Sequence, residues 1–79
     1  MDHYYKELTG FQVGDLVRVN EALPGQLPIY WKGKIVKIHT GGRLANVEDV
    51  NPNSSYYGEA FSRLVESLTR WDSKDDVNI

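Results

Sequence analysis

Short runs of alternating apolar and polar residues, separated by glycine and proline, run through much of the chain. Val17 and Val19 alternate with polar residues in one run, and Trp31 begins another that continues with β-branched residues and lysines. Alternation with a period of two is typical of strands with one buried face. The pattern predicts five strands, near residues 15–20, 30–38, 43–48, 55–60 and 64–68.

The segments between these runs carry turn signals. Pro24-Gly25 marks a long loop and Gly41-Gly42 a tight hairpin turn. Gly33, inside the longest predicted strand, indicates a bend, a bulge or a close backbone approach. A short strand, a long loop, a longer strand, a tight turn and another strand are how small five-stranded barrels begin. We expect the aliphatic residues of the long loop to fold back over the open end of the barrel, and the alternative is an exposed contact patch. These residues are Leu23, Leu27 and Ile29.

Residues 59–71 are compatible with two structures. Their apolar residues recur at helical spacing, and Glu66 precedes Arg70 by four residues in the order that supports a helix. A barrel instead needs a short turn at residues 61–63 and a closing strand at 64–68. We expect the turn and strand, which make the fold mainly β, and a C-terminal helix in an α+β fold is the alternative. The predicted core consists of Val17, Val19, Ile35, Val47, Phe61 and Leu64.

Composition sets limits on the class of protein. A chain of 79 residues with a net charge of −2 predicts one domain and argues against phosphate neutralisation as its main role. The chain has no cysteine, which excludes disulfides and thiolate metal sites. No apolar run approaches the roughly 20 residues that span a bilayer, and the first residues do not resemble a signal peptide. We expect a cytoplasmic protein without membrane insertion, with an N-terminal arm at 1–10, a barrel at 11–68 and an acidic tail at 69–79.

The sequence shows no arrangement of residues that indicates catalysis. His3 and His39 lack partners at metal-ligand spacing, and Gly41-Gly42 lacks the pattern of a phosphate-binding loop. Glu48 and Asp49 are adjacent, so on a strand their side chains point to opposite faces. The expectation is a protein that is not an enzyme and has no catalytic, cofactor-binding or metal-binding residues.

Three stretches of the sequence resemble SH3-like small barrels. Residues 14–19, 30–38 and 61–64 are similar to small barrels of photosynthetic electron-transfer complexes, namely the photosystem I peripheral subunit, the ferredoxin–thioredoxin reductase variable chain and the ferredoxin-docking subunit of the NDH complex. The chain also resembles the C-terminal barrel of retroelement integrases, at Val13-Gly14-Asp15, Trp31-Lys32-Gly33 and Ser62-Arg63-Leu64. Both resemblances imply a five-stranded SH3-like barrel. The first group implies docking to a protein assembly and the second implies nucleic-acid binding.

Size, near-neutral charge, an apolar loop and several aromatic residues favour a non-catalytic protein–protein docking module, as a small subunit or adaptor of a larger assembly. The loops after the first and third strands are expected to gather the partner-binding residues into one patch. These residues are Leu23, Leu27, Tyr30, Trp31, Lys32, Tyr56 and Tyr57. The alternative is a nucleic-acid-binding barrel that uses Lys32, Lys34, Lys37 and Arg43. Self-association is a further expectation, because so small a core supplies only about 3–5 kcal/mol.

Overall fold

Five antiparallel strands in one sheet form the protein in a computed structural model that describes residues 10–71. Residues 1–9 of the predicted N-terminal arm and residues 72–79 of the predicted acidic tail lie outside these residues. The strands are β1 (Leu16–Asn20), β2 (Tyr30–Ile38), β3 (Leu44–Asp49), β4 (Ala60–Leu64) and β5 (Leu68–Arg70), with a 3₁₀ turn, η1 (Val65–Ser67), before β5. The order across the sheet is β4-β3-β2-β1-β5. The predicted mainly β fold with five strands is therefore confirmed, and the strands form one antiparallel sheet.

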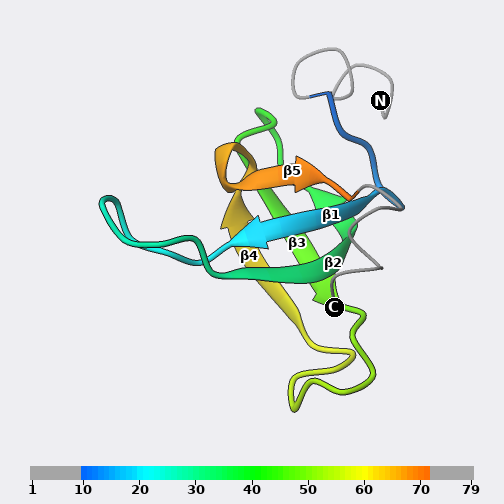
Figure 1. Cartoon of the computed structure of the whole chain (residues 1–79). Helices are drawn as coiled ribbons and strands as arrows, with labels where there is room; N and C mark the ends of the chain where they lie inside the picture. The colour runs from blue at the N-terminus through cyan, green and yellow to red at the C-terminus, as the bar shows by residue number, and fades with distance from the viewer. Residues whose placement is uncertain (1–9, 72–79) are drawn as a thin grey trace.

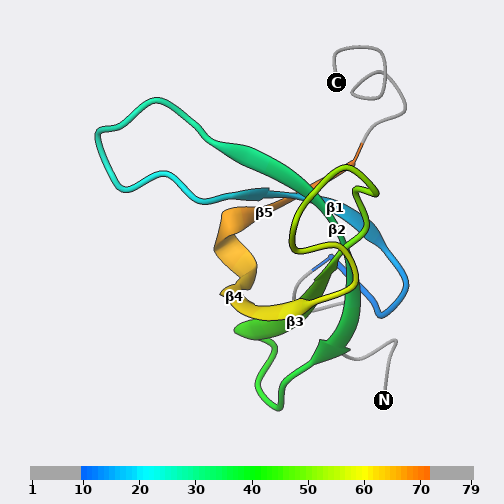
Figure 2. The same cartoon turned by 90° about the horizontal axis from the view of Figure 1, so that it is seen from below.

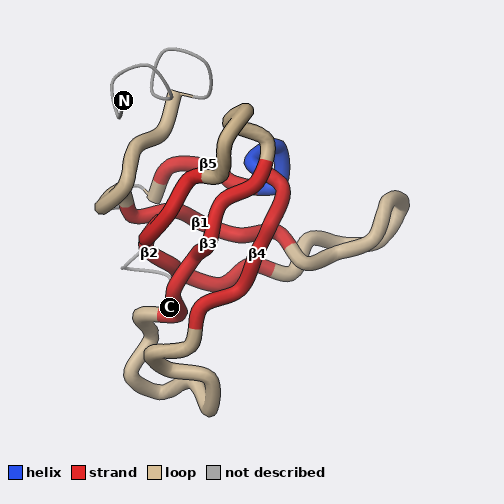
Figure 3. The backbone as a smooth tube through the Cα atoms, turned by 180° about the vertical axis from the view of Figure 1, so that it is seen from behind, coloured by secondary structure: helices blue, strands red, loops and turns tan. Residues whose placement is uncertain are grey.

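The sheet folds over on itself along β2. The first half of β2 pairs with β1, and the second half pairs with β3 after an overlap at Gly33 and Lys34. Figure 1 shows β5, β1 and β2 crossing in front of β3 and β4, and Figure 3 shows the same crossing from behind. A bulge at Val36, between Ile35 and Lys37, increases the bend of β2.

Gly33 makes the expected close backbone approach at the centre of this fold. A Cβ atom added there would lie 2.3 Å from Cγ1 of Val47 and 3.0 Å from the ring of Trp31. Any side chain at this position would therefore displace the neighbouring strand or the tryptophan. The hairpin turn predicted after β2 is also present, and its glycines Gly41 and Gly42 have φ angles of 95° and 72°.

The core lies between the two halves of the folded sheet. Its buried residues are Val17, Val19, Ile35, Ala45, Val47 and Leu68. Four of the six predicted core residues are thus confirmed. The prediction was wrong for Leu64, which is 46% exposed, and for Phe61, which is only partly buried. Both lie on β4, an edge strand with a neighbour on one side only.

The predicted positions of the last two strands were also wrong. Residues 61–63 belong to β4 and not to a turn, the 3₁₀ turn follows at Val65–Ser67, and β5 runs beyond the expected end at residue 68. The loop before β4 is longer than expected because its own polar side chains hydrogen-bond its backbone as far as Tyr56. The alternative of a helix over residues 59–71 was wrong as well, since η1 is the only helical element there.

The loop of residues 21–29 does not cover the open end of the sheet. Figures 1 and 2 show it projecting away from the strands as a long hairpin. Leu23, Leu27 and Ile29 are all exposed, and Leu27 is 87% exposed. The expectation that they fold back was wrong, and the loop is exposed as in the alternative. Among the described residues, no helix has the length and apolar character needed to cross a membrane.

Candidate functional site

A groove of about 420 Å³ opens where the base of loop 21–29, the start of β2, the end of β3, loop 50–59 and β4 meet. A volume of this size is typical of sites that take a small molecule or a few side chains. We call it the central groove. Its lining residues are Glu21, Trp31, Asp49, Ser54, Tyr56, Phe61 and Arg63.

Three aromatic rings form the apolar part of the central groove. Trp31 and Phe61 pack edge to face with ring centroids 5.9 Å apart, and Tyr56 packs on Phe61 at the same distance and in the same manner. The sheet register places two of these rings on the core side of the sheet. Trp31 lies opposite the buried Val19 and Phe61 opposite the buried Val47, and residues directly opposite each other point to the same face. The rings therefore continue the concave face of the core out to the solvent, and loop 50–59 supplies Tyr56.

An ion pair closes one side of the central groove. Nε and Nη2 of Arg63 donate hydrogen bonds of 2.7 and 2.8 Å to the two carboxylate oxygens of Glu21. These bonds lower the pKa of Glu21 below its ordinary value; partial burial opposes the shift, and a hydrogen bond from Trp31 and the charge of Arg63 add to it. The same pairing raises the pKa of Arg63. Both groups are therefore charged at neutral pH, in the bidentate geometry that arginine and carboxylate favour.

A buried carboxylate, Asp49, organises the part of the central groove that loop 50–59 supplies. It is only 5% exposed. Its Oδ1 accepts the backbone N–H of Asn51 at 2.9 Å, and its Oδ2 accepts the hydroxyl of Ser54 at 2.6 Å. Oγ of Ser54 in turn accepts the backbone N–H of Tyr56 at 3.1 Å. This chain of bonds fixes the loop that carries the Tyr56 ring.

The structure does not bring the seven predicted partner-binding residues into one patch. Trp31 and Tyr56 line the central groove, whereas Tyr57 is exposed and does not line it. Leu23 and Leu27 lie on the projecting loop. The last two of the seven, Tyr30 and Lys32, lie on β2 and do not line the groove.

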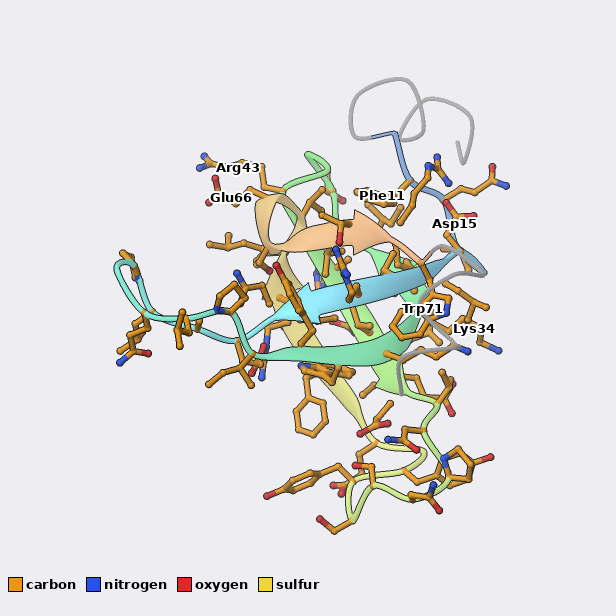
Figure 4. The ribbon with its side chains drawn as sticks, in the orientation of Figure 1. Phe11, Asp15, Lys34, Arg43, Glu66 and Trp71 are labelled. Atoms are coloured by element: carbon orange, nitrogen blue, oxygen red, sulfur yellow. The ribbon has the colours of Figure 1, made fainter. Side chains whose placement is uncertain are left out.

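These two residues belong to a different surface, the outer face of β1 and β2. The guanidinium of Arg18 lies 4.3 Å from the ring centroid of Tyr30, and Nζ of Lys32 lies 4.8 Å from that of Trp71. Arg18 and Lys32 are direct cross-strand neighbours. Figure 4 shows Trp71 and Lys34 at the same end of the sheet. We call this surface the cationic face and define it by Arg18, Tyr30, Lys32, Lys34 and Trp71.

The four predicted basic residues are also divided. Lys32 and Lys34 lie on the cationic face, where Lys34 stands opposite Glu48. Lys37 lies beyond the bulge, opposite Asn46. Arg43 lies in the turn before β3, and Figure 4 places it on the other side of the molecule from Lys34. Two of the four residues therefore share a face, together with Arg18, which was not among the predicted basic residues.

Five of the residues that line the groove were not predicted as site residues from the sequence: Glu21, Asp49, Ser54, Phe61 and Arg63. Phe61 and Arg63 were assigned to a turn, although their spacing of two is the alternation that places both on one face of a strand. The polar run after Asp49 contained a signal, since aspartate, asparagine and serine bond backbone N–H groups two residues on and organise loops in this way. The Glu21–Arg63 pair left no signal in the local pattern.

Within residues 10–71, no three His, Asp or Glu side chains are grouped so that they could hold a metal ion. Comparisons with known protein families, with curated proteins and with solved structures find no match for this chain.

Proposed function

We propose that this chain is a non-catalytic docking module that binds a segment of a partner protein in the central groove. The observation that carries the proposal is the set of aromatic rings that extends from the core into a solvent-open groove beside an ion pair. Tryptophan, tyrosine and arginine dominate the binding energy of protein interfaces, and they do so from well-packed pockets. Trp31, Tyr56 and Arg63 supply all three residue types within one groove.

The projecting loop supports the proposal because it extends the groove. Glu21, at the base of this loop, lines the groove, and the exposed Leu23, Leu27 and Ile29 follow along it. A stable interface needs about 800 Å² from each partner, which is more than a groove of this volume offers. We therefore include one side of the loop in the docking surface, as an apolar extension of the groove.

The carboxylates of the groove favour binding over catalysis. Glu21 is held by Arg63 in a bidentate pair. Both oxygens of Asp49 accept hydrogen bonds that hold loop 50–59 in place. Each carboxylate therefore has a role in shaping the groove. A general base instead needs a lone pair directed at a substrate proton, so these roles favour binding over catalysis.

Two neighbouring tyrosines provide a matched test. Tyr56 and Tyr57 are 58% and 60% exposed, but Tyr56 alone lines the groove. We expect the immobilised full chain to retain a defined partner from a lysate of its source cells, and the purified partner to bind Tyr57→Ala as it binds the wild type. Tyr56→Ala should bind it at least tenfold more weakly, as expected for an interface hot spot. Equal binding by both variants would show that the central groove is not the docking site.

The cationic face supports nucleic-acid binding as a second candidate function. Like charges directly opposite each other destabilise a sheet, yet Arg18 and Lys32 occupy such positions, each against an aromatic ring. Basic groups interleaved with aromatic rings are typical of surfaces that bind single strands. Retention on DNA-cellulose at low salt, lost steeply as salt rises and lost in the Lys32→Ala plus Lys34→Ala variant, would favour this function over docking.

A further inference from the structure

The central groove carries a net negative charge. Three of its seven lining residues are charged: Glu21, Asp49 and Arg63. Glu21 and Arg63 neutralise each other in their bidentate pair. The buried carboxylate of Asp49 is left without a paired cation among the groove residues, and charges in buried sites are weakly screened by salt. The groove therefore favours a positively charged occupant.

The aromatic rings of the groove are also suited to a cation. The guanidinium carbon of Arg63 lies 5.4 Å from the centroid of Phe61, within the range over which a ring attracts a positive charge. One side of the aromatic cluster thus already holds a cation. Trp31 and Tyr56 both pack edge to face on Phe61, and tryptophan is the ring that attracts cations most strongly.

The hydrogen bonding in the groove restricts the kind of cation. A guanidinium needs a carboxylate fork, and Arg63 already occupies the fork of Glu21. The oxygens of Asp49 already accept the Asn51 N–H and the Ser54 hydroxyl. The groove thus offers negative charge and ring faces, while each of its carboxylate oxygens already accepts one bond from the protein. A methylated ammonium group fits this chemistry, because it carries its charge with few or no N–H donors to satisfy.

We propose that the central groove receives the methylated ammonium group of a lysine side chain in the partner segment. This inference rests on the proposed docking function and specifies the group that enters the groove. The rings of Trp31, Tyr56 and Phe61 contact the methyl groups, and the charge of Asp49 attracts the ammonium. Loop 21–29 contacts the flanking residues of the segment.

The test uses three peptides of one sequence that differ in a single side chain: trimethyl-lysine, lysine and the neutral analogue with carbon in place of the trimethylated nitrogen. Each is titrated into the ¹⁵N-labelled full chain while the indole N–H of Trp31 and the backbone amides of residues 54–63 are followed by NMR. We expect the trimethyl-lysine peptide to bind about tenfold more tightly than the neutral analogue, with lysine between them. Tenfold corresponds to about 1.4 kcal/mol, within the range of partly desolvated cation–aromatic contacts.

Two variants localise the effect, and a third serves as their control. Phe61→Leu keeps an apolar side chain but removes the ring, and it should remove the preference for the charged peptide. Tyr56→Leu tests the same point at an exposed position where folding is not at risk. Tyr57→Leu removes an equally exposed ring outside the groove and should bind like the wild type.

The outcomes separate this inference from the docking function. If the neutral analogue binds as tightly as trimethyl-lysine, the groove is an apolar docking site, so the inference fails while the docking function stands. If no peptide shifts the groove signals, or the shifts map to Arg18 and Trp71, the inference also fails. The docking function is then decided separately by partner capture with Tyr56→Ala and Tyr57→Ala.

Discussion

Loops 21–29 and 50–59 begin with the same kind of hydrogen bond but differ in the bonding that follows it. In each case the side chain of the last residue of the preceding strand accepts a hydrogen bond from the backbone N–H two positions on. Asn20 accepts it from Ala22 at 3.0 Å, and Asp49 accepts it from Asn51 at 2.9 Å. In loop 50–59 the bonding continues through the polar residues, and the loop packs at the groove. Loop 21–29 instead projects from the sheet and exposes its aliphatic residues (Figure 2).

The difference lies in the residue at the start of each loop. Asp49 is buried and charged, and it binds both the backbone and the Ser54 hydroxyl. Asn20 is neutral and makes one further bond, to the Ile29 N–H at 3.4 Å, which closes only the base of its loop. The polar loop is therefore held by its own side-chain hydrogen bonds, and the apolar loop exposes its aliphatic residues. Hydrophobicity alone does not predict which of the two loops contributes a side chain to the aromatic cluster of the groove.

Removing the anchor of loop 50–59 should have the largest effect. Asp49→Ala deletes two hydrogen bonds to a charged group and leaves two partly buried donors without this acceptor, at a cost of about 3 kcal/mol. A domain of this size has about 3–5 kcal/mol in total, so urea denaturation should show loss of most of its stability. Asp49→Asn keeps one acceptor oxygen and should cost about 1 kcal/mol. Wild-type stability in Asp49→Ala would show that the carboxylate does not anchor the loop.

The corresponding change in the other loop should be milder. Asn20→Ala removes the two bonds that close the base of loop 21–29, both of which lie near the surface. We expect a loss of about 1 kcal/mol in urea denaturation. The comparison between the loops fails if this variant loses as much stability as Asp49→Ala.

The ion pair between Glu21 and Arg63 predicts a smaller, pH-dependent effect. The pKa of Glu21 is lowered in the folded protein, so the pair stabilises the fold above the ordinary glutamate pKa of about 4.3. This stabilisation is lost as the pH falls through the lowered pKa. Since both side chains are about one third exposed, the contribution should stay below about 1 kcal/mol.

The measurement is the urea midpoint of the wild type and of Glu21→Gln between about pH 6 and about pH 3. We expect the wild type to be the more stable at the upper end and the two curves to converge at the lower end. Parallel curves would mean that Glu21 gains nothing from Arg63 in the folded state.

The sequence predicted the first three strands well because their alternation extends over several residues and glycines mark their ends. It misplaced the last two because β4 and β5 are short and a turn lies between them. Phe61, Leu64, Val65 and Leu68 then fall at helical spacing by coincidence, although they occupy two strands and a turn. Local periodicity does not distinguish these cases in so few residues.

The groove was predictable only in part, for a related reason. Trp31 and Tyr56 were recognised as aromatic candidates from residue type alone. Glu21 and Arg63 lie 42 residues apart in sequence, and their pairing depends on how β4 aligns with β3. An ion pair of this kind follows from the strand register, and the register depended on the position of β4, which was assigned wrongly.

The smallest effect on stability is expected at the tip of loop 21–29. Leu27 is 87% exposed, so Leu27→Asp neither creates a cavity nor buries a charge. Its stability should stay within about 0.5 kcal/mol of the wild type, whereas Ile35→Ala in the core should lose about 2–5 kcal/mol. Under the proposed docking function, the same Leu27→Asp variant should lose partner capture, because a carboxylate on the apolar side of the loop would be desolvated in the interface. A loss of more than about 1 kcal/mol in Leu27→Asp would indicate that the loop packs on the sheet, as its hydrophobic pattern first predicted, since exposed positions rarely cost that much.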